Sequence, residues 1–121
     1  MSGQQPIVVH ITSSGVDDWQ TALQNLANLV QDESLSVPTP PEMIQVVVNG
    51  YAVRFPLSTA PEAAEILRMA EAGVEITVCD NSLDRFGYAQ DTLAEGVAVV
   101  SSGVAAVTRA QQRGATYLKL P

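Results

Sequence analysis

Cysteine, histidine and basic residues are all scarce in this sequence. Its 121 residues include one cysteine, Cys79, and one histidine, His10, so an intrachain disulfide and a cysteine-based zinc site are excluded. Six Lys and Arg stand against 13 Asp and Glu, which gives a formal net charge of −7. Proteins that bind nucleic acids or anionic membranes need clustered basic side chains, and here the six are dispersed. The composition therefore argues against both classes of partner.

Long apolar segments are absent as well, and charged residues make up only 16% of the chain. No apolar run approaches the length that crosses a membrane, and residues 1–5 lack the basic start and apolar core of a signal peptide. We therefore expect a cytoplasmic protein. Because so few charges on a small domain indicate a surface partly covered by another subunit, we also expect a homo-oligomer.

What fills the chain is an alternation of β-branched strands and amphipathic helices. Strands are predicted at residues 6–12, 43–48, 74–79, 96–100 and 115–120. The helices between them are predicted to start at a cap on Asp17 or Asp18, at a capping box over 59–62, near Ser82, and at a cap on Ser102. This order predicts one α/β domain over residues 1–121, with a mostly parallel sheet of about five strands and helices on both faces.

Small polar residues follow several of the predicted strands. In open α/β sheets, ligands bind outside the carboxyl ends of the strands, and these ends lie at one edge. The residues expected to contribute to a site there are Ser13, Asn49, Cys79, Asn81, Ser82 and Ser102. No metal-ligand spacing, glycine-rich nucleotide motif or serine triad accompanies them, so the sequence predicts neither a metal nor a cofactor.

Cys79 is the strongest candidate for chemistry, because it ends a strand and precedes a helix that Asn81 or Ser82 is expected to cap. Unpaired N–H groups at a helix N-terminus stabilise a thiolate, which is the nucleophilic form of cysteine. Asp80 opposes this effect with its negative charge. Arg85, one turn beyond Ser82, is in a position to favour the thiolate, but a solvated helix residue is the preferred interpretation. We expect the sulfur to be partly accessible. The alternative is a buried and inert cysteine.

Two other features carry weaker expectations. His10 lies within the first predicted strand, among valines and back from the sheet edge. It is expected to be a hydrogen-bonded core or interface residue rather than a catalytic base. Residues 12–15 faintly resemble a phosphate-binding loop, but Asp17 and Asp18 would repel a phosphate at the start of the next helix. An ordinary strand-to-helix turn is therefore favoured there.

Two segments of the second half carry a family resemblance. Residues 73–87, GVEITVCDNSLDRFG, and 96–121, GVAVVSSGVAAVTRAQQRGATYLKLP, resemble the DsrE/DsrF-like family of small sulfur-relay proteins. The most specific parts are Cys-x-Asn-Ser-Leu after an apolar strand, and the later Ser-Gly-Val, Gln, Arg-Gly, Tyr and Pro pattern. Residues 46–53, VVVNGYAV, also fit the family's second strand and the turn after it. The resemblance covers nearly the whole chain and is specific for the superfamily rather than for one activity.

The resemblance implies a flavodoxin-like three-layer fold and a homotrimer or homohexamer. It also implies that Cys79 carries sulfur as a persulfide, taken from a desulfurase or rhodanese and passed to another small sulfur protein. The function that the resemblance implies is therefore that of a sulfurtransferase-like sulfur carrier. The alternative is a non-catalytic oligomeric module that binds a small ligand or a protein, with Cys79 as a packed wall residue of the crevice.

Overall fold

A computed structural model of the protein describes residues 4–121 and is built around one parallel β-sheet. Its strands are β1 (Ile7–Ile11), β2 (Ile44–Val48), β3 (Glu75–Cys79), β4 (Val97–Val100) and β5 (Thr116–Leu120). They lie in the order β4-β3-β2-β1-β5, and every neighbouring pair is parallel. The predicted α/β architecture is confirmed, because each of the five strands lies within about one residue of its predicted range.

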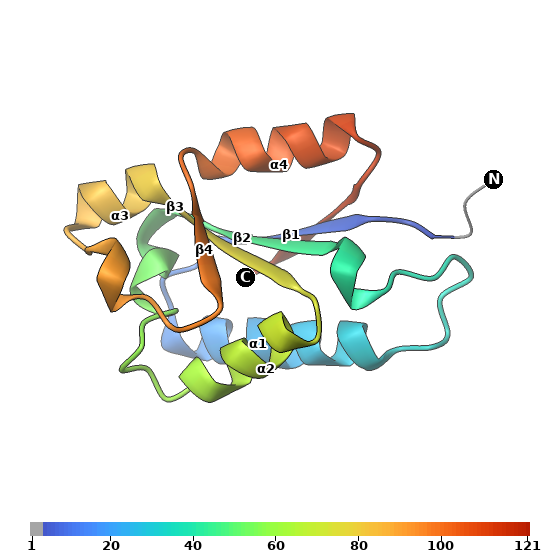
Figure 1. Cartoon of the computed structure of the whole chain (residues 1–121), viewed down its shortest axis with the longest axis horizontal. Helices are drawn as coiled ribbons and strands as arrows, with labels where there is room; N and C mark the ends of the chain where they lie inside the picture. Colours follow the sequence, from blue (N-terminus) through green and yellow to red (C-terminus); the bar gives the residue numbers. More distant parts are fainter. Residues whose placement is uncertain (1–3) are drawn as a thin grey trace.

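Helices cover both faces of the sheet and produce three layers (Figure 1). The elements outside the sheet are α1 (Val16–Gln31), η1 (Pro41–Met43), η2 (Gly50–Arg54), α2 (Ala63–Glu71), α3 (Asp80–Phe86), η3 (Gln90–Thr92) and α4 (Gly103–Gln112). Figure 1 shows α1 and α2 below the sheet, α4 above it, and α3 beside the carboxyl end of β3. In the described part of the chain, no helix combines the length and apolar character needed to span a membrane.

The two faces of the sheet bury apolar side chains to different extents. On the α1/α2 face, strand residues such as Val9, Val46 and Val78 pack with helix residues that include Trp19 and Leu26 in an extended core. On the α4 face, the buried apolar cluster is small and consists of Val8, Val47, Ala106, Val107 and Ala110. Because successive strand residues point to opposite faces, the continuous apolar runs of β1 and β2 supply both layers.

Two helices begin at other residues than the sequence predicted. Gly15 is the N-cap of α1, so Asp17 and Asp18 lie in the first turn of this helix. Their negative charges interact favourably with the positive end of the helix dipole, but neither side chain caps the helix. The capping box predicted over 59–62 does not form, and α2 starts only at Ala63 without a side-chain cap. The segment before α2 is tied instead to the chain before β4, by a bridge between Leu57 and Leu93. This tertiary contact holds residues 58–62 in turns.

Candidate functional site around Cys79

Cys79 is the last residue of β3, and α3 starts at the next residue. Cys79 therefore occupies the N-cap position itself, so the prediction of a cap at Asn81 or Ser82 was wrong. The pairing of β3 with β4 continues as far as Cys79 and Val100, which leaves no linker between strand and helix. The thiol thus lies nearer the free N–H groups of the helix than the sequence indicated.

Four hydrogen-bond donors converge on the Cys79 sulfur. Three are the backbone N–H groups of Gly103, Ser82 and Asn81, the last of which is shared with the carbonyl of Ser101 at 3.4 Å, and the fourth is the Ser82 hydroxyl. The oxygen of that hydroxyl accepts a hydrogen bond from the N–H of Gly50 at 2.8 Å, which leaves its proton free to face the sulfur. The thiol is therefore held between the N-termini of α3 and α4.

These donors decide the ionisation of Cys79. Burial raises the pKa of the thiol, but the hydrogen bonds from the Ser82 hydroxyl and from the N–H groups of Gly103, Ser82 and Asn81 together lower it by more. The net pKa lies below that of an ordinary cysteine, because each donor stabilises the thiolate over the thiol. A thiolate is the form that attacks sulfur in exchange reactions.

The two charged neighbours that the sequence singled out are engaged elsewhere. The carboxylate of Asp80 accepts a hydrogen bond from the side chain of Gln90 at 3.0 Å. The guanidinium of Arg85 lies over the ring of Phe86, 5.4 Å from its centroid. Neither charge is among the causes of the shift in the Cys79 pKa. The ionisation of the thiol is therefore governed by neutral donors rather than by nearby charges.

Gly103 is a site residue that the sequence analysis missed. It is the first residue of α4 and is buried where this helix crosses the ends of β2 and β3. A Cβ at this position would lie 2.9 Å from Cβ of Asn49, 3.1 Å from Cβ of Cys79 and 3.3 Å from Cγ1 of Val47. Glycine is thus what allows the helix N-terminus to come close enough to direct its N–H at the sulfur. The available signal was a glycine directly after a predicted capping serine, Ser102.

Close packing against α4 also covers the sulfur. Cys79 is 5% exposed, so the predicted partial accessibility is wrong for the single chain. The start of α4 lies against Cys79, because a Cβ on Gly103 would be 3.1 Å from the Cβ of Cys79, so we expect that a reacting sulfur atom needs a local opening of the junction between α3 and α4.

The predicted polar residues divide into those that meet Cys79 and those that do not. Asn81 and Ser82 donate to its sulfur, and Asn49 packs beside it against Gly103. Ser102 contributes through α4. Its hydroxyl caps this helix, as predicted, by accepting a hydrogen bond from the N–H of Ala105 at 3.3 Å.

Ser13 does not join this group. Its hydroxyl donates to the Asp18 carboxylate at 2.5 Å and accepts from the N–H of Gly15, at the turn between β1 and α1. These bonds are local to residues 13–18, as expected for an ordinary strand-to-helix turn.

His10 connects Asn49 to the far side of the sheet. Its Nε2 is hydrogen-bonded to Oδ1 of Asn49, and its Nδ1 lies 2.7 Å from the hydroxyl of Tyr117 on β5. The ring is partly buried and also packs against Tyr117, with 5.7 Å between the ring centroids. A line of polar contacts therefore runs along the α4 face from the neighbourhood of Cys79 to the edge strand β5.

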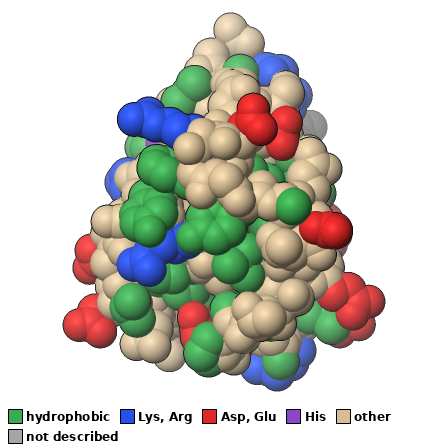
Figure 2. All heavy atoms as spheres, turned by 90° about the vertical axis from the view of Figure 1, so that its left-hand side faces the viewer, with side chains coloured by type: hydrophobic (Ala, Val, Ile, Leu, Met, Phe, Trp, Pro, Cys, Tyr) green, Lys and Arg blue, Asp and Glu red, His purple; other side chains and the backbone are tan. Residues whose placement is uncertain are grey.

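An aromatic–arginine patch, made of Tyr51, Arg54, Arg85 and Phe86, lies on the elements that follow β2 and β3. The rings of Tyr51 and Phe86 are exposed and 4.9 Å apart between centroids, and the guanidinium of Arg54 lies 4.9 Å from the centre of the Tyr51 ring. Figure 2 shows the side of the molecule on which α3 lies, where hydrophobic side chains gather near the middle with a basic side chain beside them.

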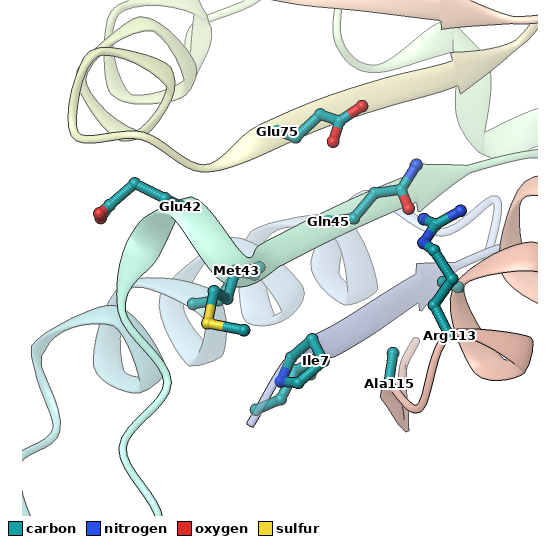
Figure 3. A pocket seen from close by; sticks show the side chains of 10 residues that line it. Ile7, Glu42, Met43, Gln45, Glu75, Arg113 and Ala115 are labelled. Carbon is teal, nitrogen blue, oxygen red and sulfur yellow. The ribbon is translucent and has the colours of Figure 1, made fainter. Parts of the chain in front are cut away.

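Two hollows lie away from the sulfur. One of about 310 Å³ is at the amino ends of the strands, where the side chains of Gln45 and Arg113 extend toward each other and Glu42 and Glu75 lie nearby (Figure 3). Its charged residues are exposed, and it is at the opposite end from the strand termini that bind ligands in such sheets. The other, of about 280 Å³, lies beside α4 and is lined by residues that include His10 and Tyr117.

Within residues 4–121, no group of three or more His, Cys, Asp or Glu side chains is arranged to hold a metal ion.

Known proteins share this sequence pattern and fold. The sequence profile of the DsrE/DsrF-like family matches residues 7–120. A protein of unknown function from Methanobacterium thermoautotrophicum, MTH1491, has 28% sequence identity to this chain. Its structure matches with a TM-score of 0.84, over 96% of this chain and 99% of that chain. The ychN protein from E. coli is 14% identical, with a TM-score of 0.70 and the same coverage. A conserved protein of unknown function, BT1422 from Bacteroides thetaiotaomicron, is 19% identical, with a TM-score of 0.64 and 93% coverage of both chains. No curated protein matches the chain.

Proposed function

The chain belongs to the DsrE/DsrF-like family, which is generally associated with sulfur relay, and from this membership we propose that it is a sulfur carrier that holds sulfane sulfur as a persulfide on Cys79. The observation that carries the proposal is the convergence of four hydrogen-bond donors on this one sulfur atom. Such a site stabilises a thiolate without a metal or a second cysteine. Carriage of sulfur needs little more than that.

The proposed reaction is an exchange between sulfur atoms. The Cys79 thiolate attacks the outer sulfur of a donor persulfide, a new S–S bond forms to Sγ, and the bond inside the donor breaks. The donor leaves as a thiolate with the electron pair of that bond, so no external oxidant or reductant is consumed. Delivery to an acceptor thiolate is the same exchange, with Cys79 as the leaving thiolate. The four donors keep Sγ in the thiolate form that loading requires, and in delivery they stabilise the negative charge that returns to Sγ as Cys79 leaves.

The aromatic–arginine patch is the proposed docking surface for the proteins that supply and receive the sulfur. Aromatic residues and arginine are enriched at protein interfaces, and Tyr51 and Phe86 are exposed side by side. On a chain of net charge −7, two of the six basic residues, Arg54 and Arg85, lie in this patch. We therefore expect partners that present acidic side chains around their own reactive sulfur.

We also propose that the carrier, a single domain over residues 1–121, works in the cytoplasm as a homotrimer or homohexamer. Its charged content of 16% supports an assembly, as do exposed apolar side chains on the α4 side. Val104 on α4 and Tyr117 on the edge strand β5 are 61% and 41% exposed. An uncovered edge strand with apolar neighbours is a ready surface for association. Sedimentation equilibrium measures the subunit number directly.

The decisive experiment is sulfur loading. Incubation with a cysteine desulfurase and cysteine is expected to increase the mass of each chain by one sulfur atom, and dithiothreitol should remove it. Cys79→Ser is the matched control, because the hydroxyl fills nearly the same volume and should preserve the fold while loading is lost. Wild-type protein that stays unloaded with several competent desulfurases and rhodaneses would overturn the proposal.

The second candidate is a non-catalytic binding module in which Cys79 is a wall residue, and the burial of this side chain favours it. Alkylation of the folded protein by iodoacetamide at neutral pH separates the two. A carrier opens often enough for its thiolate to react faster than the same thiol in an unfolded chain. A wall residue reacts far more slowly folded than unfolded.

A further inference from the structure

Asn49 has hydrogen-bond donors that nothing in the described part of the chain uses. Its Oδ1 is engaged by Nε2 of His10, whereas its Nδ2 group makes no hydrogen bond to any described residue. The residue is partly buried at the carboxyl end of β2. Two N–H groups without a partner in such a place are available to a ligand.

Asn49 and Cys79 are lateral neighbours on the α4 face. Val48 and Val78 form the last register pair of β2 and β3, and these two residues directly follow them. Both place their Cβ atoms against the same point at the start of α4, within 2.9 and 3.1 Å of a Cβ built on Gly103. The side chains of Asn49 and Cys79 therefore start side by side under the first residue of α4.

His10 and Tyr117 determine which end of the amide is available. A neutral imidazole has one nitrogen that donates and one that accepts. When the Tyr117 hydroxyl donates to Nδ1, the imidazole proton is on Nε2 and is donated to Oδ1 of Asn49. The amide N–H groups then remain free. The opposite tautomer would require the amide to turn round, and its free end would be a carbonyl oxygen, which repels an anion.

Loading moves the negative charge of the site from one atom to another. In the thiolate form of the unloaded protein the charge is on Sγ, where the donors from Ser82, Gly103 and Asn81 stabilise it. In a persulfide the charge is on the outer sulfur, one bond further out. The donors to Sγ favour the thiolate, so a separate donor is needed to hold the loaded form.

We propose that Asn49 holds the transferred sulfur by donating from Nδ2 to the outer sulfur of the Cys79 persulfide, and that His10 and Tyr117 are positioning residues that keep the amide in this orientation. This inference rests on the proposed carrier function. A hydrogen bond to a charged acceptor is the stronger kind, so its loss should cost about tenfold in the stability of the loaded form. It should leave the unloaded thiol unchanged.

The test compares the pH profile of iodoacetamide alkylation before loading with the lifetime of the persulfide after loading. Asn49→Ala is expected to shorten that lifetime about tenfold while the thiol profile stays as in wild type. Tyr117→Phe removes one hydroxyl from an exposed ring and cannot unfold the chain, and it should give a smaller loss of the same kind.

Two further variants separate positioning from packing. His10→Leu should shorten the persulfide lifetime, and His10→Gln should restore it, because a glutamine amide returns an N–H group near the position of Nε2. In the Asn49→Ala background, His10→Leu should cause no further change, since the histidine acts through the asparagine. Gln111→Ala is the matched control, because this exposed residue lines the same hollow as His10 and should alter nothing.

The outcomes distinguish this inference from the function on which it rests. If wild-type protein loads and Asn49→Ala keeps a wild-type persulfide lifetime, the role of Asn49 is wrong and the carrier function stands. If Asn49→Ala changes the thiol profile as strongly as the persulfide lifetime, the residue acts on Sγ and the proposal is also wrong. If wild-type protein does not load, the carrier function itself is overturned.

Discussion

The two faces of the sheet serve different purposes. On the α1/α2 face, every strand contributes apolar side chains to an extended core, and helices α1 and α2 together cover it. On the α4 face, one helix of ten residues covers a cluster of five buried apolar residues, flanked by His10, Asn49, Thr77 and Cys79. Polar residues at positions where an apolar pattern would be more stable are what a functional face is expected to show, in agreement with the site proposed there.

Two polar residues of the α4 face also differ in whether their hydrogen-bonding groups are used. Thr77, fully buried on β3, satisfies its hydroxyl by donating to the carbonyl of Val46 at 2.6 Å, so it is a structural polar residue. Asn49, two strand positions from the apolar Val47, leaves its amide N–H groups unused among the described residues. The α1/α2 face thus supplies most of the apolar burial, and the α4 face carries the polar groups on which the proposed sulfur site depends.

The largest expected effect tests the stability side of this comparison. Leu26→Ala, at a fully buried position on α1, should lower the free energy of unfolding by about 2–5 kcal/mol, because it leaves a cavity in the larger core. The Cys79 thiol pKa should not change. Val107→Ala on α4 is the counterpart on the other face and should cost less, since it removes fewer carbon atoms, and from a smaller cluster. Urea denaturation gives both values, and equal losses would show that the two faces contribute alike.

A smaller effect on stability, joined to an effect on the thiol, is expected at the junction of the faces. Gly103→Ala places a Cβ 2.9 Å from that of Asn49, closer than packed carbons allow, so α4 must move away from the sheet. Overpacking of this kind costs about 1–3 kcal/mol. The shift also withdraws an N–H donor from the Cys79 sulfur, so the pKa of the thiol should rise. The pH profile of alkylation measures that change, and an unaltered profile in a destabilised variant would remove Gly103 from the site.

The strands were predictable from the sequence because their signal is local. The β-branched runs at residues 7–11 and 44–48 predict strands buried on both faces without reference to the rest of the chain. The cap at Ser102 is local as well, because its hydroxyl accepts a hydrogen bond from the N–H three residues later. The cap of α3 and the start of α2 were missed because pairing with β4 and the contact of Leu57 with Leu93 set them. These determinants lie outside the local pattern.

The contacts that link His10, Asn49 and Tyr117 were not predictable either, because they join residues that are far apart in the sequence. His10 and Tyr117 are 107 residues apart, and they meet because β5 returns to pair with β1. Likewise, Gly103 reaches Cys79 only through the crossing of α4 over β2 and β3, which also buries the sulfur. Sequence reasoning placed Cys79 correctly at a strand end, but its partners depended on strand order.

The smallest expected effect concerns pH. Because hydrogen bonds hold the pKa of the folded Cys79 thiol below its ordinary value, the unfolded chain binds a proton that the folded chain releases in the interval between the two pKa values. Stability therefore rises with pH across this interval, is fully present above the ordinary thiol pKa of about 8.5, and is lost as pH falls through the folded pKa. The free energy of unfolding of wild-type protein, measured relative to Cys79→Ser, should increase with pH over the same interval.

Ser82→Ala removes the strongest of the donors that lower the pKa of the thiol, so it should flatten this pH dependence. It should also cause a loss of about 1–3 kcal/mol that does not depend on pH, because the N–H of Gly50 loses its partner. A difference between wild type and Cys79→Ser that stays level, or that falls as pH rises, would show that the thiol is not stabilised as a thiolate, and the α4 face would then differ from the α1/α2 face in packing alone.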